Sequence, residues 1–294
     1  MKEEVQFYIH NTLIFGTFKK AKNMGKNPAV VLLHGYSSFR DELTGFAELA
    51  EKLSYNGISS LRIDMRGCGK SPKRGELYPF PEWIEDALAA VTYLEMRKDV
   101  HRERIGIIGM SMGGGTAIYA AALDKRIKAV VALAPVGDGE AWLKNLWVSY
   151  KGEKAWNTFV SKVLEDQKNE VLTGKSQWVH ISEVLAFEKT ANSSHAAIMK
   201  MYPQFLEEVP LSSAYSCFKF RPLDIVHKIS PRPLRIIHSN EDESVPVEQA
   251  KLLYANTGEI KDLILINDSP HCFWIGPKSQ EVQSKTVEWM VKYL

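Results

Sequence analysis

The sequence predicts an α/β fold in which helices cover both faces of a mostly parallel sheet and one helical insertion interrupts the pattern. Apolar, strand-like segments alternate with segments of helical periodicity along most of the 294 residues. Several strand-like segments are continuous apolar runs, which is typical of strands buried on both faces of a parallel sheet. Strands that alternate with helices require right-handed crossovers, which place helices on both faces. Residues 136–222 break the alternation.

The predicted strands differ in character along the chain. Residues 5–9 and 13–18 are short, and the residues HNT between them predict a hairpin. The later strands are richer in β-branched and apolar residues, as expected for the interior of a sheet. These later strands are expected at 29–35, 58–64, 104–110, 127–135, 234–240 and 262–268.

Helices are predicted between the strands. Residues 41–55 carry apolar side chains at helical spacing, and Gly57 follows as a stop signal. A second helix begins near Pro81, because proline suits the first turn of a helix. A third helix follows Ser111. The last two helices are expected at 247–254 and 280–293.

Residues 136–222 predict a cap or lid rather than part of the sheet. Their pattern is largely helical, with no clear buried strand. Connections of this length are uncommon in compact domains unless they serve a function. The sequence is therefore divided into an α/β core, residues 1–135 and 223–294, and a helical insertion, residues 136–222.

Composition and charge exclude several classes of protein. The chain has 45% hydrophobic and 24% charged residues, and its net charge of +2 is too small for a nucleic-acid or membrane-surface protein. Cys68, Cys217 and Cys272 form no metal-binding spacing, so we expect reduced thiols in a cytoplasmic protein. The first residues do not match a signal peptide, and no run reaches membrane-spanning length. The oligomeric state stays open, with a homodimer as one alternative.

A serine stands among glycines in the segment RIGIIGMSMGGGTAIYAAAL, where a strand is expected to become a helix. Gly109, Ser111 and Gly113 form the pattern G-x-S-x-G, in which glycine avoids clashes around a tight turn. Such a turn exposes the serine hydroxyl and directs the N–H of Met112 to the same space, at a helix N-terminus. A flexible glycine loop is the alternative, but the buried strand before the serine and the small-residue helix after it favour a nucleophile.

A serine nucleophile needs a base, and in this architecture the base is a histidine that follows the acid in the chain. His271 lies in SPHCFW, just after the last predicted strand, where ligands bind in such sheets. His238 lies within a strand and His227 in a polar segment before one, so both are expected to be structural. His271 is the predicted base.

The segment SNEDESVPVEQ offers three acids after the strand at 234–240. Asp242 is the predicted partner of the histidine, and Glu241 and Glu243 are the alternatives. An acidic run of this kind can also be a solvated loop before a helix. Asp138, which follows another strand, is a more distant alternative.

Backbone amides are predicted to bind the negative charge that develops on a substrate. In the segment LLHGYSS, Gly35 permits a turn, so that the N–H of Tyr36 joins that of Met112 as a second donor. His34 is expected to hold this loop by hydrogen bonds, and the Tyr36 hydroxyl is an additional candidate for the pocket. The turn DMRGCGKS is expected to be structural, because it lacks the pattern of a phosphate-binding loop.

Five segments in this order, HGYSS, DMRGCGKS, GMSMGG, EDESVP and SPHCF, resemble the α/β-hydrolase superfamily over nearly the whole chain outside the insertion. Within it, the sequence is most similar to feruloyl (cinnamoyl) esterases and to dienelactone-hydrolase-like or prolyl-oligopeptidase-like proteins. One departure is Pro270, where many relatives have glycine; proline stiffens the loop without removing the base. The residues that this resemblance implies for catalysis are the triad Ser111, Asp242 and His271 and the oxyanion-hole donors Tyr36 and Met112.

The predicted function is a serine esterase that cleaves a carboxylic ester through an acyl-enzyme intermediate. No metal or organic cofactor is implied, and the expected partner is a small-molecule ester. Trp142 and Trp147 are predicted to line the mouth of the pocket and favour an apolar or aromatic substrate group; alternatively they form a small core of the insertion. Amide, thioester or carbon–carbon hydrolysis by the same triad stays open, as does, with less support, a non-catalytic receptor.

Overall fold

The centre of the protein is a mostly parallel sheet. The computed structural model describes residues 1–73, 75–186, 202 and 204–294. Its strands are β1 (Lys2–Ile9), β2 (Thr12–Lys19), β3 (Asn27–Leu33), β4 (Ser59–Asp64), β5 (Val100–Met110), β6 (Ile127–Leu133), β9 (Leu234–Ser239) and β10 (Lys261–Ile266). They lie in the order β1-β2-β4-β3-β5-β6-β9-β10. β2 pairs antiparallel with β1 and β4, and all other neighbours are parallel, as predicted.

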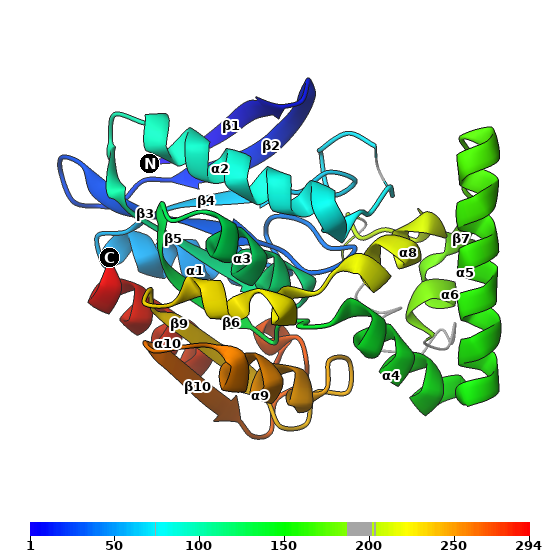
Figure 1. Cartoon of the computed structure of the whole chain (residues 1–294). Helices are drawn as coiled ribbons and strands as arrows, with labels where there is room; N and C mark the ends of the chain where they lie inside the picture. Colours follow the sequence, from blue (N-terminus) through cyan, green and yellow to red (C-terminus); the bar gives the residue numbers. More distant parts are fainter. Residues whose placement is uncertain (74, 187–201, 203) are drawn as a thin grey trace.

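Helices cover both faces of the sheet (Figure 1). The core helices are α1 (Gly45–Tyr55), α2 (Ile84–Met96), α3 (Met112–Leu123), α9 (Val247–Asn256) and α10 (Ser279–Tyr293). Successive residues of the buried strand β3 point to opposite layers. Val30 and Leu32 pack with α1 and α10, whereas Val31 and Leu33 pack with α2, α3 and α9. This two-sided burial explains the continuous apolar run in the sequence.

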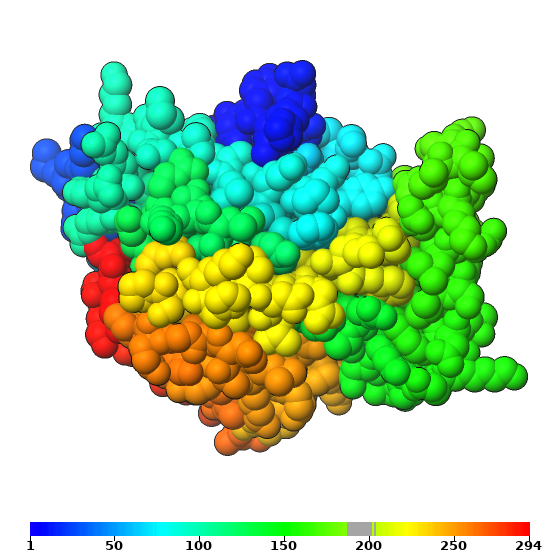
Figure 2. Space-filling model, in the orientation of Figure 1, coloured from blue at the N-terminus to red at the C-terminus, as the bar shows by residue number. Residues whose placement is uncertain are grey.

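Between β6 and β9 the chain leaves the sheet and forms a cap. The cap elements are α4 (Gly139–Lys151), α5 (Glu153–Thr173), β7 (Trp178–His180), α6 (Ile181–Leu185), β8 (Glu208–Pro210) and α8 (Ser212–Lys219). Helix α5 is the element furthest from the sheet and forms the outer wall of the molecule on that side (Figures 1 and 2). The boundaries at 136 and 222 remain a prediction, and residues 187–201 and 203 of the insertion lie outside the described residues.

Two elements differ from the sequence-based expectation. β7 and β8 pair antiparallel within the insertion, where no clear buried strand was expected, because three residues are too few to show a period. Helix α1 begins at Gly45 rather than near residue 41. Glu42, Leu43 and Thr44 have φ values of 43°, 53° and 74°, and a right-handed helix requires φ near about −63°.

Short helical turns complete the described elements: η1 (Pro79–Trp83), η2 (Pro222–Asp224), η3 (Val226–Ile229) and η4 (Phe273–Ile275). η1 runs directly into α2, close to the start that Pro81 predicted. In the part of the chain that the structure describes, no helix combines the length and apolar character needed to cross a membrane.

The turn between β5 and α3 is tightly packed. Ser111 has φ 57° and ψ −120°. A Cβ atom on Gly109 would lie 2.0 Å from the carbonyl oxygen of Gly113, and one on Gly113 would lie 2.3 Å from the carbonyl oxygens of Leu33 and His34. Backbone atoms cannot move aside as a flexible side chain would, so glycine is required at both positions by close approach.

Gly113→Ala should therefore lower the free energy of unfolding by about 3 kcal/mol or more, the upper end of the range for overpacking. Urea unfolding of the variant and the wild type measures the difference. Gly258→Ala is the comparison variant, because its methyl group would lie 2.8 and 2.9 Å from side-chain atoms of Ser230 rather than from backbone atoms, and it should cost less stability than Gly113→Ala. Equal unfolding midpoints for the Gly113 variant and the wild type would contradict the steric argument.

Candidate active site

The structure brings Ser111, His271 and Asp242 together in one hydrogen-bonded series. Ser111 stands at the turn after β5, and its Oγ lies 3.0 Å from Nε2 of His271. The other ring nitrogen of His271, Nδ1, lies 2.6 Å from Oδ2 of Asp242. A carboxylate only accepts hydrogen bonds, so Nδ1 carries the proton and Nε2 is free to accept one from the serine hydroxyl.

Asp242 is held by the loop that follows β9. Its side chain is fully buried, and Oδ1 accepts hydrogen bonds from the N–H groups of Ser244 and Val245, at 2.9 and 2.8 Å. Its two neighbours in the acidic run lie elsewhere. Glu241 accepts a hydrogen bond from the N–H of Asp268, and Glu243 is exposed. Of the three acids, Asp242 is the one that contacts the imidazole.

The pKa values of His271 and Asp242 are set by the burial of both groups and by their mutual attraction. Burial lowers the pKa of His271, but the Asp242 charge, their hydrogen bond and the Glu42 charge raise it, and the pKa ends above its ordinary value. Burial raises the pKa of Asp242, but the imidazole lowers it below its ordinary value. Asp242 is therefore ionised near neutral pH, and the site favours a positive charge on His271.

Two backbone amides near Ser111 have no hydrogen-bond partner among the residues that the structure describes. Tyr36 follows Gly35 in the loop after β3, and Met112 is the first residue of α3. A methyl group on Gly35 would lie 3.4 Å from Cβ of Ser111, so this loop packs directly against the serine. Neither the Tyr36 nor the Met112 amide donates a hydrogen bond to any residue that the structure describes. Both are available to an acceptor near the serine hydroxyl.

The His34 side chain holds the Gly35 loop, as expected, whereas the Tyr36 hydroxyl, a candidate for the pocket, contacts the cap. Nδ1 of His34 donates to the carbonyl oxygen of Gly35 at 2.8 Å, and Nε2 accepts from the N–H of Met65 at 3.1 Å. Burial lowers the pKa of His34, which favours the neutral ring that these two bonds require. The Tyr36 hydroxyl is buried and donates to Oγ of Ser213 in the cap at 3.0 Å. This hydroxyl is therefore engaged by the cap.

Sequence reasoning missed two buried side chains beside the site. Glu42 accepts a hydrogen bond from the N–H of Gly35 at 2.7 Å, although its segment was predicted to be helical. His238 was predicted to be structural, and its Nε2 donates to the carbonyl oxygen of Val245 at 2.8 Å. The same nitrogen lies 3.4 Å from Oδ2 of Asp242. No sequence pattern indicated that either side chain reaches the site, because their proximity arises from loop conformation.

The two tryptophans predicted for the pocket have different surroundings. Trp142 is buried between cap and core: its ring lies 6.1 Å from that of Tyr36, and Nε1 donates to the carbonyl oxygen of Ser244 at 2.8 Å. Trp147 stacks on Phe159 with ring centres 4.4 Å apart, and its Nε1 donates to a carbonyl oxygen of α6. Trp142 therefore adjoins the site, whereas Trp147 belongs to the aromatic core of the cap, which was the alternative.

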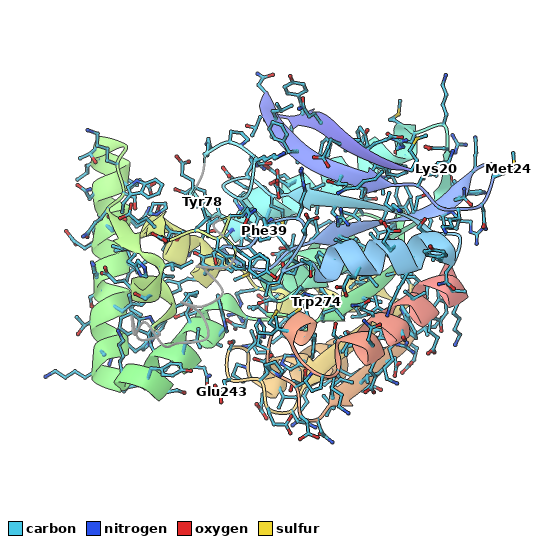
Figure 3. The ribbon with its side chains drawn as sticks, turned by 180° about the vertical axis from the view of Figure 1, so that it is seen from behind. Lys20, Met24, Phe39, Tyr78, Glu243 and Trp274 are labelled. Carbon is cyan, nitrogen blue, oxygen red and sulfur yellow. The ribbon has the colours of Figure 1, made fainter. Side chains whose placement is uncertain are left out.

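Aromatic side chains also approach from the loop that follows β3 and carries Gly35 and Tyr36. Phe39 packs edge-on against Phe205 of the insertion, with ring centres 5.8 Å apart. Figure 3 shows Phe39 and Glu243 towards the end of the core that faces the cap, with Met24 at the opposite end. This end carries the Ser111 site, between the core and the cap.

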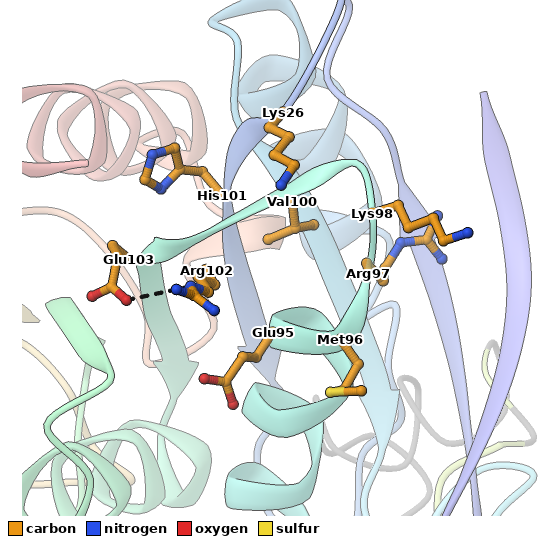
Figure 4. Close-up of a pocket in the computed structure, with 9 residues that line it drawn as sticks. All are labelled: Lys26, Glu95, Met96, Arg97, Lys98, Val100, His101, Arg102 and Glu103. Atoms are coloured by element: carbon orange, nitrogen blue, oxygen red, sulfur yellow. Dashed lines mark ion pairs between the residues drawn. The ribbon is translucent and has the colours of Figure 1, made fainter.

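An open hollow of about 630 Å³ lies at the other end of β5 (Figure 4). Its lining includes the exposed basic residues Lys26, Lys98 and Arg102, and Arg102 pairs with Glu103 at 3.7 Å. No side chain in it contacts the Ser111 series. In the described ranges, no three side chains of metal-binding type form a cluster that holds an ion.

Comparison with known proteins gives relatives with several activities. The chain is 28% identical over 284 residues to an uncharacterized 31.7 kDa protein of the traX-finO intergenic region of Escherichia coli, covering 95% of both. It is 25% identical to the polyketide transferase ATR5 of Stachybotrys chlorohalonatus, covering 100% of this chain and 98% of that protein. It is 26% identical to the thiohydrolase aneE of Aspergillus aculeatus, covering 76% and 71%.

Solved structures share the fold. The α/β hydrolase GrgF from Penicillium sp. sh18 superimposes with a TM-score of 0.82 at 18% identity, covering 100% of this chain and 99% of that one. Est1E from Butyrivibrio proteoclasticus with ferulic acid bound gives 0.70 at 21% identity, covering 98% of both. The family model of serine aminopeptidase S33 matches residues 26–277. The chain therefore belongs to the serine aminopeptidase S33 family and has the α/β-hydrolase fold.

Proposed function

We propose that this protein is a serine esterase that cleaves a carboxylic ester through an acyl-enzyme intermediate. The observation that carries the proposal is the series Ser111 Oγ, His271 and Asp242, with contacts of 3.0 and 2.6 Å. The nucleophile, a base within hydrogen-bonding reach and a buried acid that orients the base are the parts that acyl transfer by serine requires. Membership of a hydrolase family supports the general class.

The acylation step follows from this arrangement. Nε2 of His271 takes the proton from the Ser111 hydroxyl as Oγ attacks the ester carbonyl. The carbonyl oxygen becomes an oxyanion, and the Tyr36 and Met112 amides donate to it; a donor of this kind is worth about 10²–10³ in rate. The imidazolium then gives its proton to the leaving alcohol, so that an acyl-serine remains.

Deacylation reverses the roles with water in place of the alcohol. His271 takes a proton from water, the hydroxide attacks the acyl-serine, and the imidazolium returns the proton to Oγ of Ser111 as the acid leaves. The Asp242 carboxylate stabilises the imidazolium in both steps and keeps the proton on Nδ1. The fully buried carboxylate is the reason that a single tautomer of His271 is favoured.

The side chains around the serine support a substrate with an apolar or aromatic group. Trp142 and Phe39 approach from the cap and from the oxyanion loop, and both belong to aromatic clusters. Est1E, which has the same fold, binds ferulic acid, an aromatic carboxylic acid. Thioester cleavage is the second candidate, because one relative is a thiohydrolase and another is a polyketide transferase.

Ser111→Ala should reduce kcat for ester hydrolysis by about 10⁶-fold, because no other group replaces the nucleophile. Hydrolysis of p-nitrophenyl esters measures the loss, and a fluorophosphonate should label the wild type but not the variant. Ser161→Ala, at an exposed position of α5, is the control and should keep both activity and labelling. Retained activity in the Ser111 variant would exclude this residue as the nucleophile.

Matched substrates separate the ester from the thioester. The same acyl group, aliphatic or aromatic, is carried as the ester of N-acetylethanolamine and as the thioester of N-acetylcysteamine, so that the leaving groups differ only in oxygen or sulfur, and kcat/KM is measured for each pair. We expect the ester to have the higher kcat/KM in every pair, and the aromatic acyl group to exceed acetate. Higher values for the thioester throughout would instead assign the second candidate.

The pH dependence of kcat/KM should follow the ionisation of His271. The base must be neutral to accept the serine proton, so activity is lost as the pH falls through its pKa. Because the pKa of His271 is raised, the midpoint should lie above about 6.5, the ordinary value for histidine. Initial rates between about pH 5 and 9 test this. A midpoint below the ordinary value would contradict the assigned electrostatics.

A further inference from the structure

A second carboxyl group is buried beside the candidate active site. Glu42 is only 6% exposed, and it lies in the loop between β3 and α1. Its Oε2 accepts the N–H of Gly35 at 2.7 Å, one residue before the Tyr36 amide. A buried carboxyl group is unfavourable unless its oxygens are bonded, so this bond ties the side chain to the oxyanion loop.

The carboxyl group is also close to the reacting serine. A methyl group on Gly35 would lie 3.4 Å from Oε1 of Glu42 and 3.4 Å from Cβ of Ser111. A single point beside Gly35 is therefore within van der Waals distance of both Glu42 and Ser111. From the loop after β10, His271 and Cys272 interact electrostatically with Glu42. Two other titratable groups belong to this network. Asp242 raises the pKa of His271, and His238 lowers the pKa of Asp242.

The backbone at Glu42 is held in an unfavourable conformation. Glu42, Leu43 and Thr44 have positive φ values, and so does Ser37 in the same loop, at 61°. None of these residues is glycine, so each position is energetically unfavourable, and such positions persist when the surrounding structure enforces them. Here the conformation carries the Glu42 carboxyl group inward to Gly35. A Glu42 side chain that pointed into solvent would not require these positive φ values.

We propose that Glu42 is a positioning residue for the esterase reaction: its carboxyl group fixes the Gly35–Tyr36 backbone as an oxyanion donor, and its negative charge stabilises protonated His271. The inference rests on the proposed function for its catalytic consequence. The Tyr36 donor lies on a loop whose Gly35 N–H is bonded by this carboxyl group. The imidazolium is stabilised by two carboxylates, Asp242 and Glu42, rather than by one.

The Glu42 carboxyl group gains or loses its charge close to neutral pH. Burial raises the pKa of Glu42 to about 7, although the Gly35 N–H and the positive charge of His271 act in the opposite direction. Charged and neutral forms are therefore both populated near neutral pH. The charged form raises the pKa of His271, so removal of the charge should shift the pH profile of the base to lower pH.

Two substitutions separate the effect of the Glu42 charge from the effect of its hydrogen bond to Gly35. Glu42→Gln keeps an oxygen that accepts from Gly35 but removes the charge, so the pKa of His271 should fall while kcat at high pH changes less than about threefold. Glu42→Ala removes both, so it should also lower kcat by about ten- to a hundredfold with KM little changed, as displaced catalytic groups do. Glu243→Gln, an exposed acid next to Asp242, is the matched charge control.

NMR on the free protein provides readouts that need no substrate. In the wild type, the chemical shift of the Gly35 amide proton should titrate with a midpoint near pH 7, as Glu42 ionises. The His271 ring protons should give a lower pKa in Glu42→Gln than in the wild type and in Glu243→Gln. A Gly35 amide shift that does not titrate, or an unchanged His271 pKa in Glu42→Gln, would overturn the proposal.

The kinetic and NMR arms also distinguish this proposal from the proposed function. A wild type that hydrolyses no ester and reacts with no fluorophosphonate would remove the esterase assignment and, with it, the catalytic role of Glu42, whatever the NMR result. In an active enzyme, wild-type kcat and pH profile in both variants would overturn the role of Glu42 alone. If Glu42→Ala does not fold, Glu42→Gln decides the charge effect, and a purely structural residue would leave the pKa of His271 unchanged.

Discussion

Ser111 holds a backbone conformation, φ 57° and ψ −120°, that residues other than glycine rarely adopt, and the surrounding structure has to impose it. Its N–H donates to the carbonyl oxygen of Leu133 in β6 at 2.7 Å. Its own carbonyl oxygen accepts from Gly114 and Gly115 in α3 and from Val136 after β6. The orientation of the hydroxyl is therefore fixed by the register of β5 against β6 and by the start of α3, rather than by the side chain itself.

The sheet topology supplies the partners of that hydroxyl from distant parts of the chain. β9 and β10 are parallel neighbours, with Ser239 opposite Ile266, so their following loops leave the same edge side by side. The loop after β9 carries Asp242, and the loop after β10 carries His271. The buried carboxylate is tolerable because two backbone N–H groups and the imidazole bond to it. The loop fold is thus as necessary as the acid itself.

The parts that the sequence predicted have local signatures. Continuous apolar runs identified the strands of the parallel sheet, and G-x-S-x-G identified the turn, because close backbone approach at Gly113 leaves no room for a side chain. The proximity of Glu42 and His238 to the site had no such signature. Glu42 reaches Gly35 only because three successive residues adopt left-handed backbone in place of the expected helix. Long-range packing decides such conformations, and it is not visible in a local pattern.

The loop that carries Gly35 and Tyr36 is held from both the core and the cap. On the core side, His34 and Glu42 bond to Gly35. On the cap side, the Tyr36 hydroxyl donates to Ser213 at the start of α8, and the carbonyl oxygen of Ser37 accepts from the N–H of Leu206 at 3.3 Å. The cap therefore contacts the loop that presents the Tyr36 amide. The bonds of Tyr36 to Ser213 and of Leu206 to Ser37 therefore join the cap to the same loop that the Gly35 contacts join to the core.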